Sequence, residues 1–297
     1  MRVVIVLFLN VLACQVVSAQ VEWRPLGAPE ENTILGAYRA DRQGLPKLLS
    51  SAAGPGRYVM VGPTHSIFPQ IAAGDSWETV FVIVNMSLRQ TEFTQRFYGS
   101  DGRPMRMKFI TYPGYQIVED SGVFGRLNPG ASFNFAVFRD VGPVQVGWAS
   151  LDYDTRSSRL GAYAVFRQKI PGRPTFEALV PLSAYDDTIF FMPFDNLEGF
   201  DTGMALVNPA SNIPNTVTLT FQSLRADILF QDRITLPPSG HTAFSIPSKY
   251  PSLQGKAGTV LVESNTTRLS AMGLRFNVGG GGAFSSIPIM NWSDMMY

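Results

Sequence analysis

The sequence is poor in the side chains that most often bind metals or catalyse reactions. It has one cysteine, Cys14, and two histidines, His65 and His241. A zinc site draws on a cluster of such residues, so this composition argues against one. A hydrolytic triad needs an imidazole held beside a nucleophile, and no Gly-x-Ser-x-Gly motif accompanies His241. We therefore expect His241 to face solvent at the start of a strand, in a protein that is not an enzyme.

The chain also has little charge and no long apolar run beyond its first residues. Charged residues make up 16% of the sequence, and the formal net charge is +1. Because it has no basic cluster and no acidic tail, we expect it to bind neither nucleic acid nor an anionic membrane. No later apolar run approaches the ~18 residues of a membrane span. A length of 297 residues allows one large domain or two ordinary ones.

The N-terminus predicts a secretory signal peptide over residues 1–19. Arg2 precedes an apolar run, and Val17-Ser18-Ala19 supplies the small residues that signal peptidase requires, which makes Gln20 the first mature residue. Cleavage would also remove Cys14, so the mature chain would form no disulfide, as fits a bacterial exported protein. Alternatively, the sequence LAC ending at Cys14 weakly resembles a lipoprotein box and predicts a lipid anchor. We expect an extracellular, cell-surface or periplasmic location.

One pattern occurs twice along the chain. TVFVIVNMS, beginning at Thr79, matches TGMALVNPA, beginning at Thr202, with Asn85 aligned to Asn208. Five further blocks align in the same order over about a hundred residues, which indicates an internal repeat. An asparagine present in both copies is expected to be structural, because it can end a buried strand and bond to nearby backbone.

Within each copy, the apolar residues recur with the period of a strand. VTLTF, at Val217–Phe221, alternates apolar residues with threonine, and short runs of this kind are separated by turns rich in glycine and proline. A helical turn is expected only near Pro247 to Leu253. The sequence therefore predicts an all-β protein.

About seven strands in each copy suggest two tandem immunoglobulin-like β-sandwich domains related by the repeat. The first is expected at residues 65–184 and the second at residues 188–291. Residues 20–64 would form an N-terminal segment or linker, in which Arg57–Val61 resembles an added edge strand. A jelly roll spanning both copies is the alternative architecture.

Several sequence blocks carry a resemblance to a known group of proteins. They are VFVIVN, GAYAVFRQ, FEALVPLS, FDTGMALVNP, LPPSGHTAFSIP and AMGLRFN. Together they resemble exported bacterial proteins of unknown function with tandem β-sandwich repeats, over most of residues 65–290. The resemblance implies the fold and an exported location, and it carries no catalytic residue.

An acidic loop at the start of the second copy is the candidate metal site. It contains Asp195, Asn196, Glu198 and Asp201. Calcium prefers several oxygen ligands of this kind, although the EF-hand pattern is absent. The alternative is a polar loop between two strands.

Aromatic residues of the first copy are the candidate ligand-binding residues. This copy has about a dozen extra residues, KFITYPGYQIVED, which include Tyr112 and Tyr115. Strand alternation places Trp148 on an outward face, and Trp77 precedes the first repeat strand. Loop aromatics can stack on sugars or anchor a protein partner. Alternatively, Trp148 packs beneath the extra loop or the N-terminal segment.

These features leave three functions open. The first is an exported, non-enzymatic structural or adhesion module whose partner is a glycan or a cell-envelope protein. The second is a carbohydrate-binding protein that uses the aromatic residues of the first copy. The third is a glycoside hydrolase, which needs two carboxyl groups facing each other across a cleft, and Asp152 and Asp154 are among the acidic residues available.

Overall fold

In its described residues, the computed structural model is an all-β protein with four antiparallel sheets and one short helix. No helix in the described part of the chain is long and apolar enough to cross a membrane. The predicted signal peptide, with Cys14, lies outside the described residues, as does the edge strand predicted at Arg57–Val61. The described residues are 22–26, 66–140, 142–184, 187–279 and 282–291.

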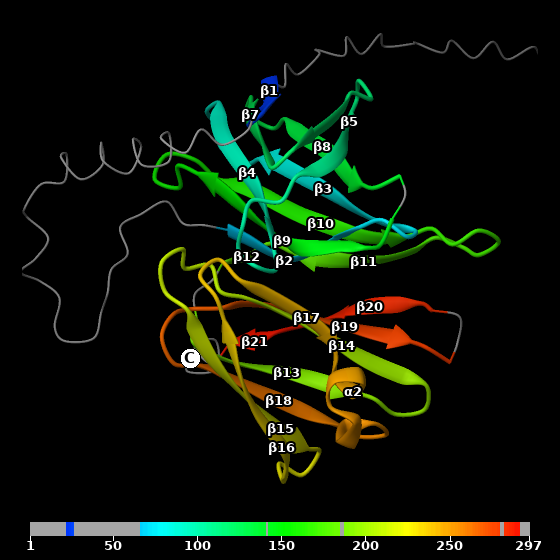
Figure 1. Cartoon of the computed structure of the whole chain (residues 1–297). Coiled ribbons are helices and arrows are strands. Elements are labelled where there is room, and N and C mark those ends of the chain that lie inside the picture. The colour runs from blue at the N-terminus through cyan, green and yellow to red at the C-terminus, as the bar shows by residue number, and fades with distance from the viewer. Residues whose placement is uncertain (1–21, 27–65, 141, 185–186, 280–281, 292–297) are drawn as a thin grey trace, which may run out of the picture.

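The first sandwich consists of two six-stranded sheets (Figure 1). Sheet I contains, in spatial order, β1 (Glu22–Pro25), β7 (Gly122–Leu127), β4 (Thr91–Gly99), β9 (Gln145–Tyr153), β2 (Ser66–Ala73) and β12 (Ser183–Ala184). Sheet II contains β11 (Phe176–Pro181), β10 (Leu160–Gln168), β3 (Trp77–Asn85), β8 (Ser132–Phe138), β5 (Met107–Tyr112) and β6 (Ile117–Asp120).

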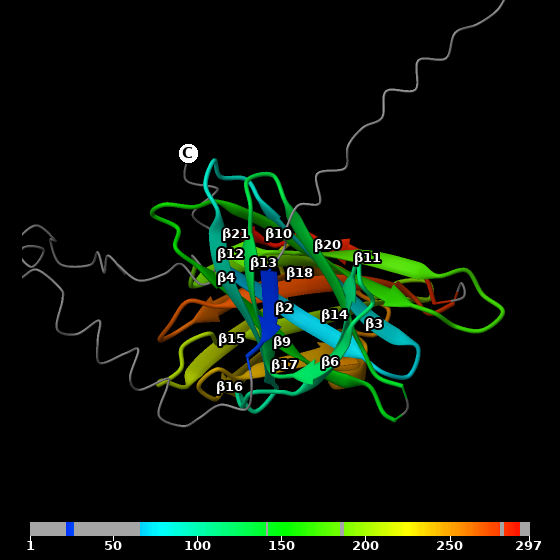
Figure 2. The same cartoon turned by 90° about the horizontal axis from the view of Figure 1, so that it is seen from above.

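The second sandwich is smaller, and the first lies over it in the view from above (Figure 2). Sheet III contains, in spatial order, β16 (Ile228–Leu236), β15 (Asn215–Ser223), β18 (Ala257–Ser264), β13 (Ile189–Asp195) and β21 (Met290–Asn291). Sheet IV contains β17 (His241–Ser245), β14 (Phe200–Val207), β19 (Ser270–Asn277) and β20 (Phe284–Ile287). The predicted helical turn is present as α2 (Ile246–Lys249) and a 3-10 turn (Pro251–Leu253).

The two sandwiches share one strand order. The order β7-β4-β9-β2-β12 of sheet I corresponds to β16-β15-β18-β13-β21 of sheet III, and β11-β10-β3-β8 of sheet II corresponds to β20-β19-β14-β17 of sheet IV. The first sandwich adds β1 and the β5–β6 hairpin. This hairpin is the stretch that the sequence comparison marked as extra in the first copy.

The predicted sandwich character is confirmed, but the finer immunoglobulin order is not. In an immunoglobulin domain, the first strand pairs with the second and the seventh lies beside the sixth. Here β13, the first strand of the second sandwich, pairs with β18, and β19 pairs with β14. Each of the four sheets draws its described strands from one copy only, so a jelly roll spanning both copies is not formed.

Alternation along the strands builds the core of the first sandwich. In β3, Phe81 and Ile83 are fully buried, while their sequence neighbours point away from the core. The ring of Phe81 stacks on that of Phe135 of β8, with 4.9 Å between the ring centroids, and lies 6.0 Å from the ring centroid of Phe97 of β4. Such aromatic contacts add to the stabilisation that comes from burying apolar area. The two sheets are therefore joined by a phenylalanine cluster.

The repeated asparagines have the structural role that the sequence predicts. Asn85 and Asn208 are fully buried at the ends of equivalent strands. Each side-chain amide donates to two carbonyls: Asn85 to those of Arg89 (2.7 Å) and Leu127 (2.9 Å), and Asn208 to those of Ile213 (2.8 Å) and Pro237 (2.9 Å). The same bond pattern thus closes the same corner of both sandwiches.

Two core-facing polar side chains of the first sandwich, Gln95 and Thr111, have no hydrogen-bond partner among the described residues. Gln95 of β4 is fully buried, and neither Nε2 nor Oε1 forms a hydrogen bond with the described residues. We expect Gln95→Met to raise the free energy of unfolding by about 1–3 kcal/mol, because an unpaired buried amide is costly. Denaturant unfolding measures this change, with Thr94→Ala on the outward face of β4 as control. A loss of stability would show that the amide of Gln95 is satisfied.

Candidate functional site

The four candidate aromatic residues lie in two separate places. Trp77 and Trp148 contact residues of the second sandwich, whereas Tyr112 and Tyr115 flank the turn between β5 and β6. Figure 1 shows β5 at the end of the first sandwich that is remote from the second. The structure therefore does not bring these residues together into one binding surface.

Trp148 points outward from β9, as strand alternation predicts, but it is only 3% exposed. Its ring stacks on Tyr98 of β4 at 4.3 Å, and its Nε1 donates to the carbonyl of Ser239 at 2.8 Å. Ile67 and Val207 complete this cluster between the sandwiches. The second sandwich provides this cover, rather than the extra loop that the sequence suggested. Most of the N-terminal segment, the other suggested cover, lies outside the described residues. A ring enclosed in this way cannot stack on a sugar.

Trp77 also contributes to the contact between the sandwiches. It begins β3 rather than lying in the preceding loop, and it is partly buried. Its ring lies 6.3 Å from that of Phe166 and 5.0 Å from that of Phe284, which belongs to β20. The carbohydrate-binding hypothesis therefore loses both tryptophans.

His241 does not face solvent, contrary to our expectation. It is 4% exposed and lies between residues of the first sandwich. Its Nε2 is 2.6 Å from Oε1 of Gln70, and its Nδ1 is 3.1 Å from Oγ of Ser100. Because the amide oxygen accepts, Nε2 carries the proton and Nδ1 accepts from the hydroxyl. Burial lowers the pKa of His241 to about 4, so the imidazole is neutral at pH 7.

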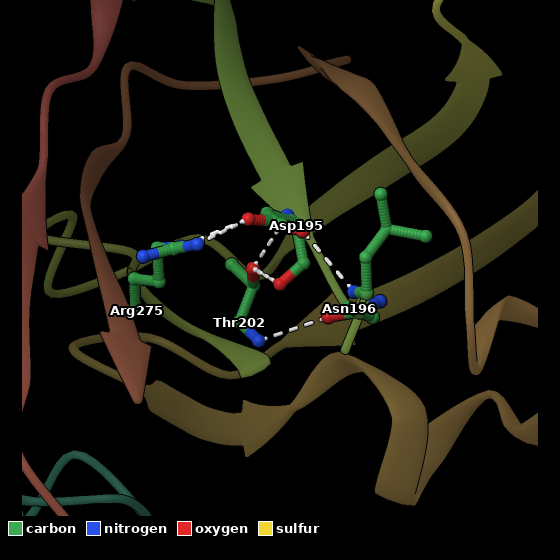
Figure 3. Close-up of polar contacts among 5 residues, drawn as sticks. Asp195, Asn196, Thr202 and Arg275 are labelled. Atoms are coloured by element: carbon green, nitrogen blue, oxygen red, sulfur yellow. Dashed lines mark hydrogen bonds and ion pairs between the residues drawn. The ribbon is translucent and has the colours of Figure 1, made fainter. Parts of the chain in front are cut away.

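The acidic loop of the second sandwich is held by an arginine (Figure 3). Nε and Nη2 of Arg275 donate to Oδ2 of Asp195 at 2.9 and 2.6 Å. Burial opposes ionisation of Asp195, but the hydrogen bonds from Arg275 and from the Leu197 N–H outweigh it and lower the pKa. The carboxylate that would bind calcium is thus already paired with a cation.

The other residues of the loop also have partners or point elsewhere. Asn196 is buried, where its Oδ1 accepts from the Thr202 N–H at 2.9 Å and its Nδ2 donates to the Leu253 carbonyl at 3.1 Å. Asp201 accepts from Ser245 at 3.3 Å, and Glu198 lies at the turn with a φ of 48°. No group of three metal-binding side chains occurs in the described part of the chain.

A threonine contact shows that this corner is structural. Oγ1 of Thr202 accepts from the Asp195 N–H at 2.8 Å and donates to the Asp195 carbonyl at 3.0 Å. In the first sandwich, Oγ1 of Thr79 makes the same two bonds with the backbone of Ala72, at 3.0 and 2.9 Å. The same pair of hydrogen bonds therefore occurs in both sandwiches, although Ala72 replaces Asp195 in the first. This supports the interpretation of a polar loop.

A hollow on the outward face of sheet I, about 440 Å³ in volume, contains the carboxylates considered for glycoside hydrolysis. Asp152 and Asp154 line it together with Glu92, Phe124 and other residues. Arg96 pairs with Asp152 at 2.6 Å. Hydrogen bonds from Ser157 and the Arg156 backbone lower the pKa of Asp154. A glycosidase needs a carboxylic acid with a raised pKa, so Asp154 is a poor general acid.

The tip of the β5–β6 hairpin is the most exposed aromatic feature of the described chain. Tyr115 is 71% exposed, and its ring meets that of Tyr112 edge to face at 5.5 Å. Its φ is 49°, a conformation that is rare for a bulky residue. The N–H of Tyr115 donates to the Thr111 carbonyl at 3.0 Å, which closes the turn. We call Tyr112, Tyr115 and the neighbouring exposed Ile117 the hairpin tip.

The contact between the sandwiches includes residues that the sequence did not single out. Gln70 and Ser100 bond His241 of the other sandwich, so the repeat could not identify their role. Tyr98 stacks on Trp148 of its own sandwich, in the cluster that the second sandwich covers. No protein-family model matches the chain, and no curated protein or solved structure gives a significant match. Function must therefore be inferred from the geometry of the molecule.

Proposed function

We propose that this protein is an exported, non-enzymatic adhesion or structural module that binds a cell-envelope protein through the hairpin tip. In this proposal, residues 65–184 and 188–291 are two tandem copies of one domain, as their shared strand order supports. The signal peptide predicted from the sequence of residues 1–19 supports a location outside the cytoplasm.

The side chains best suited to catalysis or metal binding are engaged in structural contacts. His241 joins the two sandwiches, and Asp195 is paired with Arg275. These contacts support a role that depends on surfaces rather than on catalysis. One surface that differs between the copies is the β5–β6 hairpin, which has no counterpart in sheet IV.

The conformation of Tyr115 is the observation that carries the proposal. A left-handed backbone for tyrosine costs roughly 1–3 kcal/mol, and such strain tends to occur at functional sites. The turn holds the ring in solvent beside Tyr112 and Ile117. Exposed aromatic and aliphatic groups of this kind anchor protein partners by filling apolar pockets. The edge-to-face geometry of the two tyrosines offers no flat surface on which a sugar ring could stack. We therefore propose a protein as the ligand and keep a glycan as the alternative.

A binding screen against envelope proteins and glycans tests this function. We expect the mature protein to bind an envelope protein and Tyr115→Ala to weaken that binding at least tenfold, as is typical of an interface anchor. Leu224→Ala, an exposed apolar position of the second sandwich, is the matched control. Point variants are preferable to removal of the hairpin, because β5 contributes the buried Phe109 to the core. Binding that Tyr115→Ala leaves unchanged would refute the hairpin tip, and binding to glycans alone would favour the carbohydrate alternative.

A further inference from the structure

Sheet II has an apolar outward face that the described residues leave partly exposed. Val80, Val82 and Val84 of β3 point outward between buried core residues, and they pair across the sheet with residues of β10. Tyr163, Val165 and Leu179 continue the face on β10 and β11, where Tyr163 is 41% and Leu179 is 50% exposed. We call these six residues the valine face. Exposed apolar patches of this extent mark interaction surfaces.

The sequence of β3 also indicates a strand that is covered on both sides. The run VFVIV is apolar without interruption, a pattern typical of strands buried on both faces. Its counterpart β14 is covered in that way: Ala205 and Val207 point outward and are buried. Strand β3 has the same pattern, but its outward valines remain partly exposed.

The second sandwich shows what covers a face of this type. The outward face of sheet IV, with Ala205, Val207 and Met272, is buried against the first sandwich, where β14 and β19 contact β2. Sheet IV is the counterpart of sheet II. Within this molecule, an apolar face at this position is therefore a docking face for another copy of the repeat.

We propose that the valine face binds the valine face of a second copy of this chain, in a dimer with two-fold symmetry. An apolar face is compatible with itself, and two-fold dimers are the commonest symmetric assembly. The charged residues at the end of the face are already paired within the chain, since Arg167 bonds Glu78 at 2.8 Å and Glu177 at 2.6 Å. Dimerisation would therefore not bring unpaired charges of the same sign together at the end of the valine face.

Sheet III of another copy is a poorer partner for the valine face. In the contact between the sandwiches, sheet I contributes Trp148 and Tyr98 to the covering surface. The equivalent positions of sheet III hold Thr259 and Gln222, which are paired in the same register. Sheet III therefore lacks the aromatic residues that cover sheet IV within the chain. A head-to-tail contact, in which the valine face of one copy meets sheet III of the next, would lack this feature.

The size of the valine face fits a reversible dimer. Strands β11, β10 and β3, which carry the valine face, span about 14 Å at about 4.8 Å per strand, and nine residues span about 30 Å. This corresponds to about 430 Å² on each copy and about 860 Å² in total. That total lies below the range for stable specific interfaces, about 1,200–2,000 Å², so we expect a weak and concentration-dependent dimer.

Analytical ultracentrifugation of the mature chain tests the dimer. We expect a concentration-dependent mass of twice that of the chain, and we expect the double variant Tyr163→Lys with Leu179→Lys to weaken dimerisation at least hundredfold. The double variant Leu224→Lys with Ile228→Lys, at exposed positions of the second sandwich, is the matched control and should remain dimeric. Circular dichroism confirms that each variant is folded.

A cross-linking variant distinguishes the arrangement of the copies. Cys14 is the only cysteine in the sequence and lies in the predicted signal peptide, so Tyr163→Cys introduces a single thiol into the mature chain. A two-fold contact through the valine face predicts a disulfide-linked dimer for Tyr163→Cys and none for Leu224→Cys. Three results would overturn the proposal. The wild type could remain monomeric at high concentration, the valine face could bind lipid vesicles instead, or the double lysine variant could still dimerise. Tyr115→Ala should not change the mass, which separates this test from that of the hairpin tip.

Discussion

Replacing Trp148 by alanine is expected to lower the free energy of unfolding by about 3–5 kcal/mol, the range for truncating a buried aromatic residue. The ring is enclosed between the sandwiches, where it stacks on Tyr98 and donates a hydrogen bond to Ser239. Truncation removes both contacts and leaves the Ser239 carbonyl without this donor. Because the cluster joins the two sandwiches, we also expect the wild type to unfold in one transition and the variant in two. Calorimetry and denaturant unfolding measure both effects.

Two variants control this experiment. Thr259→Ala changes the equivalent position of the second sandwich, which the described residues of the first sandwich do not cover, and should alter stability by less than about 0.5 kcal/mol. Trp148→Phe keeps an aromatic ring on Tyr98 but loses the hydrogen bond, so it should retain most of the stability. A loss below about 1 kcal/mol for Trp148→Ala would show that the two sandwiches do not stabilise each other.

Lowering the pH from 7 to 4 is expected to cost about 3 kcal/mol of stability through His241 alone. Its folded-state pKa is about 4, below the ordinary value of 6.5, because burial disfavours the charged imidazolium. The unfolded state therefore takes up the proton first as the pH falls. The stabilisation from neutral His241 is fully present above pH 6.5 and is lost as the pH falls from 6.5 towards 4. Each pKa unit corresponds to about 1.4 kcal/mol.

The variant His241→Gln isolates this effect from the titration of carboxylates. It is less stable than the wild type at pH 7 if it loses the contacts with Gln70 and Ser100, but its stability should vary less between pH 6.5 and 4. The difference between the two pH profiles, measured by denaturant unfolding, gives the contribution of His241. Parallel profiles would contradict a buried neutral imidazole. Acid should also loosen the contact between the sandwiches first, which hydrogen exchange at β2 and β17 can detect.

Much of the fold was accessible from the sequence because it depends on neighbouring residues. Alternation in β3 and β15 follows from the two-residue period of a strand, and the paired asparagines Asn85 and Asn208 identify two equivalent corners. The extra stretch of the first copy was located correctly as the β5–β6 hairpin. The immunoglobulin strand order that the sequence suggested was not confirmed, because strand order depends on which edges pair after the chain has folded back.

The candidate sites were less accessible, for a related reason. Outward alternation was the right prediction for Trp148, but alternation does not say whether another sheet lies over an outward side chain. His241 was expected in solvent because its partners, Gln70 and Ser100, lie in the other copy. Asp195 suggested a calcium site because its partner Arg275 is eighty positions away in the sequence. No local sequence pattern predicts that these two residues pair.

The sequence by itself determined the repeat, the all-β character and the buried turns, since these follow from side-chain periodicity and from hydrogen bonds within each copy. Only the tertiary structure decided which outward faces are covered. The contacts that decide it join residues far apart in the chain, such as Trp148 with Ser239 and Gln70 with His241. Packing between the sandwiches turned two predicted surface residues, Trp148 and His241, into buried ones. It left the hairpin tip and most of the valine face exposed. The second sandwich reaches the valine face only at its edge, where Ser286 of β20 donates to the Leu179 carbonyl of β11.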